Sequence, residues 1–375
     1  MHRLNYLDAL RSGAMLVVVL WHVTGSWPAV QPLGPTTMSV IQWPMGLSRW
    51  SLVLFFMMAG YFGALLHARW GTARFVRDRL LRIGVPLLVG LVTIVPLTWL
   101  IIHRWSANAA LFPEGALHLW FIYYVLLFYA AVLALPHLPG MAWLRRRLVT
   151  LLRSAVAVPV LAAITMALVL AAGLLPPAPA AVWAIPHPTL VAYYGAFFAF
   201  GALVQGSSGG MDLVGRRLGP NAALALAALV PAVLLRTGPL AAGPVWLVPT
   251  ARGYLALAAL CLLAWASTFT LCNLGRRWLA ADRPALRYVA DSSYWIYLMH
   301  LPLALVLILL IAPLGLPFPV AWLLVAALLF SILLGLYELV VRHSVVGKVL
   351  NGPRAPRGWG RRRPGNGRVP EGASG

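Results

Sequence analysis

The chain has 375 residues, of which 61% are hydrophobic and only 10% are charged, and its mean hydropathy is +0.85. Soluble globular proteins are about a quarter charged, so this composition excludes a soluble enzyme and predicts an all-α polytopic membrane protein. The formal net charge of +21 would suit nucleic acid, but membrane topology explains where the basic residues lie, and we expect no nucleic-acid partner.

Apolar spans alternate with short polar segments along the chain. They lie near residues 10–28, 48–67, 83–103, 119–138, 156–175, 188–205, 221–236, 252–272, 289–311 and 320–341. If the N-terminus is inside, all of the 29 Arg and Lys residues fall in cytoplasmic segments except Arg49, Arg104, Arg236 and Arg252. Because cytoplasmic loops are enriched in Lys and Arg, we predict about ten transmembrane helices with both termini in the cytoplasm.

The transmembrane domain is expected to cover residues 1–345, followed by a basic tail at 346–375 that is rich in Gly, Pro and Arg and is expected to be disordered. The first span has charged residues within it and lacks a small-residue cleavage pattern, which favours a retained helix over a signal peptide. Cys261 and Cys272 have neither disulfide nor metal-ligand spacing and are expected to pack inside one helix. No metal site is expected.

The first span carries two ionisable residues, Arg11 and His22, in an apolar run. Such residues are costly in a membrane and usually face a bundle interior or a cavity. Eleven residues at about 100° each return both side chains to one helix face, about 16 Å apart along the axis. An imidazole at this depth suits a general base. The alternative is a histidine bonded to a backbone carbonyl in a packed interface.

A basic segment precedes the third span, and its most specific part is Arg79-Leu-Leu-Arg82, with Arg77 nearby. Arg79 and Arg82 share a helix face, and paired guanidinium groups suit phosphate. A lipid headgroup and a phosphorylated cofactor both fit this pattern. The remaining interpretation is ordinary positive-inside charge.

The fourth span begins on the outer side with Glu114 and His118, followed by Trp120 and Tyr123. A helical turn would bring the Glu114 carboxylate and the His118 imidazole into contact, since they are four residues apart. The aromatic residues are typical of the aromatic belt at a membrane interface. We expect either that belt alone or an outer substrate site.

The ninth span contains Ser293 and His300, which are seven residues apart and share a helix face. The predicted depth of His300 is close to that of His22, and Pro302 is expected to kink the helix. Two histidines at one depth predict a polar cavity; the alternative is a structural histidine freed to bond by the kink. In the second span, Gly60 predicts the close approach of another helix backbone.

Taken together, these elements resemble the membrane-bound acyltransferase 3 family. The matching motifs, in order, are Leu7-Asp-Ala-Leu-Arg11 with His22, Phe55-Phe with Gly60-Tyr61, Arg79-Leu-Leu-Arg82 with Pro86, His118-Leu-Trp-Phe121, and Ser293-Tyr-Trp-Ile-Tyr-Leu-Met-His300. Within the family the chain is most similar to the glucan biosynthesis protein C branch of glucan succinyltransferases, which shares the pair Tyr337-Glu338.

This resemblance implies a multi-pass enzyme of the bacterial cytoplasmic membrane. It would transfer an acyl group, such as acetyl or succinyl, from cytoplasmic acyl-CoA to a hydroxyl of an extracytoplasmic carbohydrate or glycosylated small molecule. The resemblance implies catalytic roles for Arg11 and His22, with His22 as general base or transient acyl carrier. It links Arg79 and Arg82 to the acyl donor, and we add Arg77.

The substrate-binding residues would be Glu114, His118, Trp120, Tyr123, Ser293 and His300. The alternative function is a proton-coupled transporter or flippase that uses the buried histidines.

Overall fold

The computed structural model describes residues 5–34, 37–38, 40–41, 50–106, 115–173, 186–237, 250–281 and 283–351. Most of these residues are helical, and no β-strand occurs among them, which confirms the all-α prediction. The longer helices are α1 (Asn5–Val30), α3 (Trp50–Trp70), α4 (Thr72–Arg79), α5 (Val85–Val92), α6 (Ile94–Trp105), α7 (Trp120–Ala134), α8 (Met141–Arg153), α9 (Ala157–Ala171), α10 (Pro188–Gln205), α11 (Leu218–Thr237), α12 (Ala251–Trp278), α13 (Pro284–Ile311), α14 (Phe318–Leu336) and α15 (Val345–Asn351).

Within the described ranges, nine helical segments are long and apolar enough to cross a membrane, and they coincide with nine of the predicted spans. The segment Thr72–Trp105 is a continuous run through α4, a π-helical turn at Leu80–Gly84, α5 and α6. The remaining predicted span corresponds to α9, whose 15 residues are fewer than the roughly 20 of a typical membrane helix. The chain is therefore a multi-pass membrane protein.

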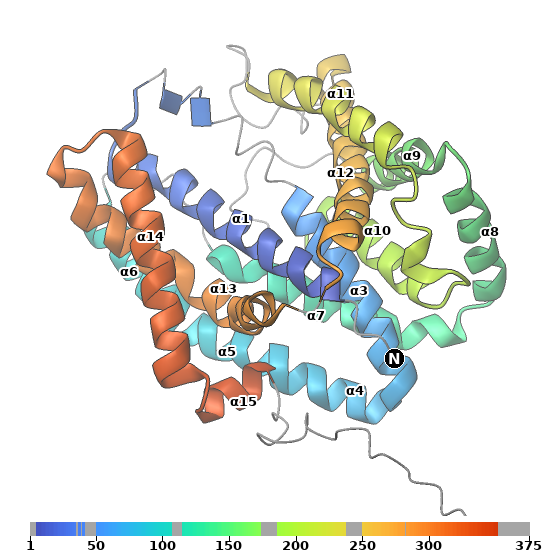
Figure 1. Cartoon of the computed structure of the whole chain (residues 1–375), viewed down its shortest axis with the longest axis horizontal. Helices are drawn as coiled ribbons and strands as arrows, with labels where there is room; N and C mark the ends of the chain where they lie inside the picture. Colours follow the sequence, from blue (N-terminus) through green and yellow to red (C-terminus); the bar gives the residue numbers. More distant parts are fainter. Residues whose placement is uncertain are drawn as a thin grey trace, which may run out of the picture.

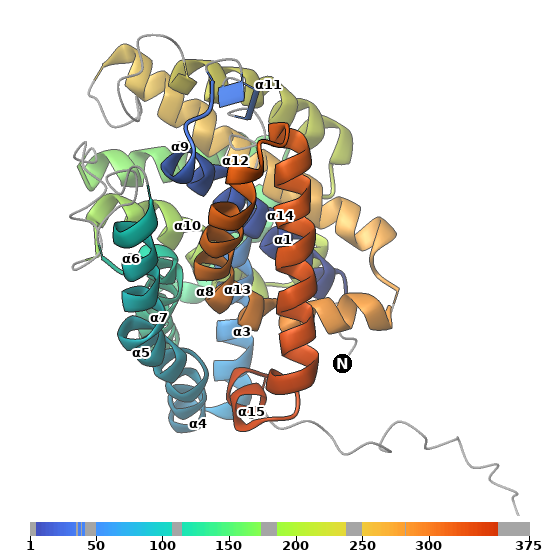
Figure 2. The same cartoon turned by 90° about the vertical axis from the view of Figure 1, so that its left-hand side faces the viewer.

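Three long helix pairs organise the bundle: α1 packs along α13, α3 along α10, and α11 along α12. In Figure 1, α14 and α6 lie on one side and α8, α9 and α11 on the other, with α1, α3 and α13 between them. Both views place α15 beside α4 at one end of the molecule (Figures 1 and 2). The last described helix therefore lies next to the basic segment that precedes the third predicted span.

The pair α3 and α10 crosses in backbone contact. A Cβ on Gly60 would lie 1.9 Å from the carbonyl oxygen of Phe198, and one on Gly201 would lie 1.9 Å from that of Met57. Any larger residue at either position would force the helices apart. The predicted close approach at Gly60 is confirmed, and Gly201 is its counterpart on α10.

Candidate functional site

Two cavities lie in the bundle and meet at a shared wall. The larger, of about 530 Å³, is lined by Arg11, Arg79 and Arg82 among others, and is named the arginine cavity. The smaller, of about 280 Å³, is lined by His22 and His118 among others, and is named the histidine cavity. The residues that line both cavities, here the shared wall, are Val18, Leu52, Phe121 and Tyr297.

One face of α1 runs past both cavities. Asp8, Arg11 and Met15 line the arginine cavity, Val18 lines both, and His22 lines the histidine cavity. These positions recur every three or four residues, as one face of a helix requires. Arg11 and His22 therefore lie on one stripe, as the sequence predicts, but the stripe opens into two compartments.

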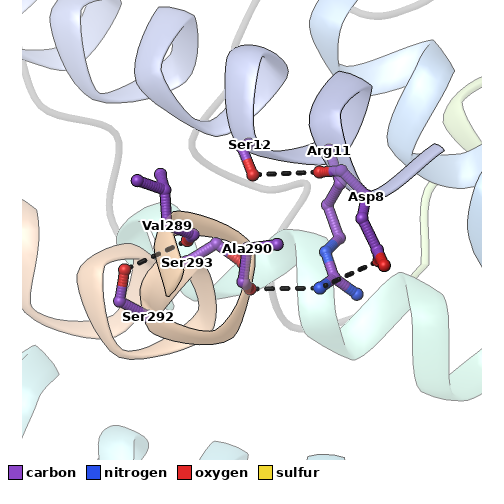
Figure 3. A network of polar contacts seen from close by, with 7 residues as sticks. All are labelled: Asp8, Arg11, Ser12, Val289, Ala290, Ser292 and Ser293. Atoms are coloured by element: carbon purple, nitrogen blue, oxygen red, sulfur yellow. Dashed lines mark hydrogen bonds and ion pairs between the residues drawn. The ribbon is translucent and has the colours of Figure 1, made fainter. Parts of the chain in front are cut away.

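Arg11 links α1 to α13 (Figure 3). Its Nη2 donates to the carbonyl oxygen of Ala290 at 3.0 Å and lies 3.5 Å from Oδ1 of Asp8. Ser293 donates its hydroxyl to the same carbonyl at 2.7 Å, and it lines the arginine cavity, not the histidine cavity. Arg11 Nε is buried and has no partner in the described part of the chain. Arg11 therefore positions two helices and keeps one donor unused.

Three histidines from separate helical elements form a cluster. His22 lies on α1, His300 on α13, and His118 in a 3₁₀ turn (Leu117–Leu119) just before α7. Ring centroids are 4.7 Å apart for His22 and His300, 4.9 Å for His118 and His300, and 6.3 Å for His22 and His118. His300 is 0% exposed and His118 is 3% exposed. The structure brings the predicted pair together and adds His118, which the sequence places in a separate outer site.

Each of these rings binds a backbone carbonyl through one nitrogen. His22 Nδ1 lies 2.8 Å from a carbonyl one turn earlier on α1, His300 Nδ1 lies 2.7 Å from that of Tyr297, and His118 Nε2 lies 3.1 Å from that of Leu298. A carbonyl oxygen only accepts, so in each ring the bonded nitrogen carries the proton. The other nitrogen of each neutral ring is then an acceptor.

These acceptor nitrogens give the cluster its chemistry. His118 Nδ1 and His300 Nε2 are buried and have no partner among the described residues, a state that costs about 1–3 kcal/mol per group. His22 and His118 line the histidine cavity, whereas His300 lines neither cavity, so a ligand there would meet the first two rings. The arrangement suits a ligand that brings hydrogen-bond donors, such as hydroxyl groups. In the described ranges, no group of three or more His, Cys, Asp or Glu is arranged to hold a metal ion.

The backbone before His118 is strained. Leu117 has a φ of 48°, the only positive value at a non-glycine residue within the described chain. A left-handed backbone costs about 1–2 kcal/mol in such residues, and the burial of Leu117 and the hydrogen bond from the Tyr297 hydroxyl to the His118 carbonyl hold it in place. Strain of this kind often accompanies functional sites. No sequence signal at Leu117 announces it.

Arg79 and Arg82 converge on one carboxylate beside the arginine cavity. Arg82 Nε lies 2.9 Å from Oδ1 of Asp78, and Arg79 bonds Oδ2 through Nε at 3.1 Å and also through Nη2. The Arg79 guanidinium carbon also lies 5.9 Å and 5.3 Å from the ring centres of Phe75 and Tyr129. Asp78 therefore holds in position the two arginines that are predicted to bind phosphate, and it compensates part of their charge.

The arginine cavity is less basic than its arginines alone would make it. Asp8 and Asp291 line the arginine cavity beside its three arginines. Arg77 is exposed and is not part of that lining. The π-helical turn at Leu80–Gly84 begins directly after Arg79, and such turns are frequent at functional sites.

Aromatic residues dominate the histidine cavity. Of the predicted outer residues, Trp120 lines it, Tyr123 lines neither cavity, and Glu114 lies outside the described residues. Further lining residues that the sequence did not single out are Trp21, Thr189, Tyr193 and Tyr194. These residues are distributed over α1 and α10 with no common spacing, so only the packed bundle brings them together.

One more histidine lies at the edge of this cavity. His187 Nδ1 is 2.8 Å from the hydroxyl oxygen of Thr189, and the His187 backbone N–H donates to the Tyr124 hydroxyl at 2.8 Å. Burial lowers the pKa of His187 below its ordinary value. His187 is therefore neutral at pH 7, so this edge of the histidine cavity adds no charge.

Comparison with known proteins gives one match. The family model described as "Acyltransferase domain" (Acyl_transf_3) matches residues 4–337, nearly the whole described bundle. No curated protein and no solved structure matches the chain. The chain therefore belongs to this acyltransferase family, and it is a membrane enzyme that transfers an acyl group other than an aminoacyl group.

Proposed function

We propose that this member of the acyltransferase domain family uses cytoplasmic acyl-CoA to acylate a hydroxyl of an extracytoplasmic carbohydrate or glycosylated small molecule. The observation that carries the proposal is the shared wall between a cavity with three arginines and a cavity with histidines and aromatic rings. For the two substrates to meet beside His22, the thioester end of the donor would pass between the four shared-wall residues into the histidine cavity.

The donor fits the arginine cavity. Coenzyme A carries a pyrophosphate and a ribose phosphate, and charge-assisted bonds to Arg79 and Arg82 would hold them. The volume of about 530 Å³ lies in the range of about 300–1,000 Å³ that is typical of ligand sites. The phosphates would share the two guanidinium groups with Asp78, and the thin pantetheine arm would extend along the α1 stripe past Met15 to Val18.

The chemistry follows from the acceptor nitrogen of His22. His22 removes the proton from the acceptor hydroxyl while the hydroxyl oxygen attacks the thioester carbonyl carbon. The new C–O bond forms, the C–S bond breaks, and the leaving sulfur of coenzyme A takes up the proton. General-base catalysis of this kind contributes about 10²–10⁴ in rate. In the alternative sequence the acceptor nitrogen of His22 attacks the thioester carbonyl, the C–S bond breaks and the thiolate of coenzyme A leaves. The acceptor hydroxyl then attacks the acyl-imidazole, the C–N bond breaks to restore His22, and the hydroxyl proton goes to the thiolate.

The acceptor fits the histidine cavity. Its described lining contains Trp120, Tyr193 and Tyr194 and no Asp, Glu, Lys or Arg, which suits a neutral sugar whose ring faces pack against aromatic side chains. The buried acceptor nitrogen of His118, which lines this cavity, would receive a hydrogen bond from one of its hydroxyls. His300 lines neither cavity and would act through its contact with His22, whose ring centroid is 4.7 Å away. The sequence resemblance favours a succinyl group, a glucan acceptor and a place in the bacterial cytoplasmic membrane within this class.

The test is a deletion strain complemented with the wild type, with His22→Ala, or with His137→Ala as a matched control. His137 is exposed and lines neither cavity. Mass spectrometry of surface glycans and secreted metabolites is expected to show an acyl group that wild type and His137→Ala restore and His22→Ala does not. Normal acylation in the His22→Ala strain, at normal protein level in the membrane, would contradict the proposal. Movement of a substrate without covalent change would instead favour a transporter.

A further inference from the structure

We propose that α15 forms part of the donor site and that Leu350 and Asn351 contact the pantetheine arm of acyl-CoA. This inference rests on the proposed function and concerns a part of the chain outside the matched family domain. The family match ends at residue 337, whereas α15 spans Val345–Asn351. The donor site would therefore include an element that the family model does not contain.

The helix α15 borders the arginine cavity. Leu350 and Asn351 line the arginine cavity together with Arg79 and Arg82. The helix packs against the π-helical turn at Leu80–Gly84, which contains Arg82, and Figures 1 and 2 both show it beside α4. A ligand bound to the two arginines thus has α15 as a neighbour.

Close contacts with the preceding turn hold α15 in this position. A second π-helical turn, Tyr337–Val341, leads into it. A Cβ on Gly347 would lie 2.2 Å from the Val341 carbonyl oxygen, so the short helix folds directly onto the turn. Asn351 donates its side-chain amide to the Tyr337 hydroxyl at 3.0 Å, and Leu350 is buried. These contacts make α15 a fixed wall of the cavity.

The chemistry of the two side chains selects the part of the donor. An Asn carboxamide both donates and accepts hydrogen bonds but carries no charge, which matches an amide of the pantetheine arm better than a phosphate. Leu350 supplies apolar surface for the methylene groups between those amides. Arg79 and Arg82 serve the phosphates, so the cavity divides the donor into a charged part and a neutral part.

The experiment uses two probes that contain no acyl group, coenzyme A and pantetheine, because their binding does not depend on which acyl group is transferred. Dissociation constants are measured on the purified full-length protein in lipid nanodiscs. Asn351→Ala and Leu350→Ala are each expected to raise the dissociation constants of both probes about threefold to tenfold. The double variant Arg79→Gln, Arg82→Gln is expected to weaken the binding of coenzyme A and to leave the binding of pantetheine unchanged. Val346→Ala, on the same helix but 48% exposed, is the matched control and is expected to bind both probes as wild type does.

A second variant separates contact from folding. Tyr337→Phe removes the hydroxyl that holds Asn351 but keeps the Asn351 carboxamide itself. It is therefore expected to weaken pantetheine binding less than Asn351→Ala does. Wild-type affinity in both α15 variants, with coenzyme A still lost in the arginine double variant, would overturn this inference and leave the proposed function standing. Weakening of coenzyme A alone by Asn351→Ala would overturn the assignment to pantetheine. Absence of coenzyme A binding to the wild type would overturn the proposed function itself.

Discussion

The arginine cavity and the histidine cavity differ most in charge. The arginine cavity is lined by charged side chains of both signs, namely Asp8, Arg11, Arg79, Arg82 and Asp291. Among the residues that the structure describes, no charged side chain lines the histidine cavity. Charge inside a membrane bundle is expensive and persists where function uses it. This difference is what the proposed function requires, since its donor is charged and its acceptor is neutral.

The two regions also differ in how their polar groups are satisfied. Beside the arginine cavity, Asp78 already pairs with Arg79 and Arg82, so a bound phosphate shares existing ion pairs. In the histidine cluster, acceptor nitrogens of His118 and His300 are buried without partners among the described residues. Under the proposed function, a phosphate would replace part of the Asp78 contacts in the first region, and a hydroxyl of the acceptor would donate a hydrogen bond in the second.

The largest expected effect is on kcat, and it follows from replacing the proposed base His22. His22→Gln keeps a polar side chain of similar reach but cannot take a proton. We expect kcat for acyl transfer to fall about 10²–10⁴-fold with the donor KM unchanged, as measured in steady-state assays on the purified enzyme. A raised donor KM at normal kcat would show that His22 belongs with the arginine cavity and would break the comparison.

The next largest effect is on the donor KM, and it follows from replacing two charged residues of the arginine cavity. A hydrogen bond to a charged group is worth about 1.5–3 kcal/mol, and each 1.4 kcal/mol is about tenfold. In kinetic assays, Arg79→Gln with Arg82→Gln is expected to raise the donor KM at least tenfold and to leave the acceptor KM unchanged. The converse variant, Asp78→Asn, frees charge and is expected to lower the donor KM. A rise in the donor KM of Asp78→Asn would mean that Asp78 mainly positions the arginines.

A smaller effect is expected on the aromatic side of the histidine cavity. Tyr194 lines this cavity, and its ring centre lies 5.4 Å from that of Trp120. An aromatic contact is worth about 0.5–1.5 kcal/mol, so Tyr194→Ala is expected to raise the acceptor KM about twofold to tenfold. Coenzyme A affinity, measured in parallel, should stay at the wild-type value. Loss of coenzyme A binding would show that the two cavities are not independent.

Helical periodicity explains what the sequence could predict. Apolar spans revealed the helices, and the spacing from Arg11 to His22 revealed the stripe on α1, because both depend only on local geometry. The pair Arg79 and Arg82 also lines one cavity, although Asp78, which lies beside them in the sequence, was overlooked. These features need no knowledge of how the helices pack.

Packing decides the rest of the site. His118 joins His22 and His300 only because the strained backbone at Leu117 and the hydrogen bond from its ring to the Leu298 carbonyl on α13 place it there. Tyr193 lines the histidine cavity without any motif or spacing that marks it. The same holds for α15, whose cavity residues follow a chain reversal beyond the last apolar span. Contacts between helices far apart in the chain leave no periodic signal in the sequence.

The smallest expected effect tests Ser293, for which the sequence predicts substrate binding. In the structure its hydroxyl donates to the Ala290 carbonyl, which also accepts from Arg11, so the carbonyl keeps a partner when the hydroxyl is removed. Ser293→Ala is therefore expected to change kcat and both KM values less than about twofold, because a hydrogen bond of this kind contributes only about 0.5–1.5 kcal/mol to stability. A selective rise in the acceptor KM would restore the substrate-binding interpretation. It would also require the acceptor to cross the shared wall, since Ser293 lines the arginine cavity, and the division of charged donor from neutral acceptor would then fail at that point.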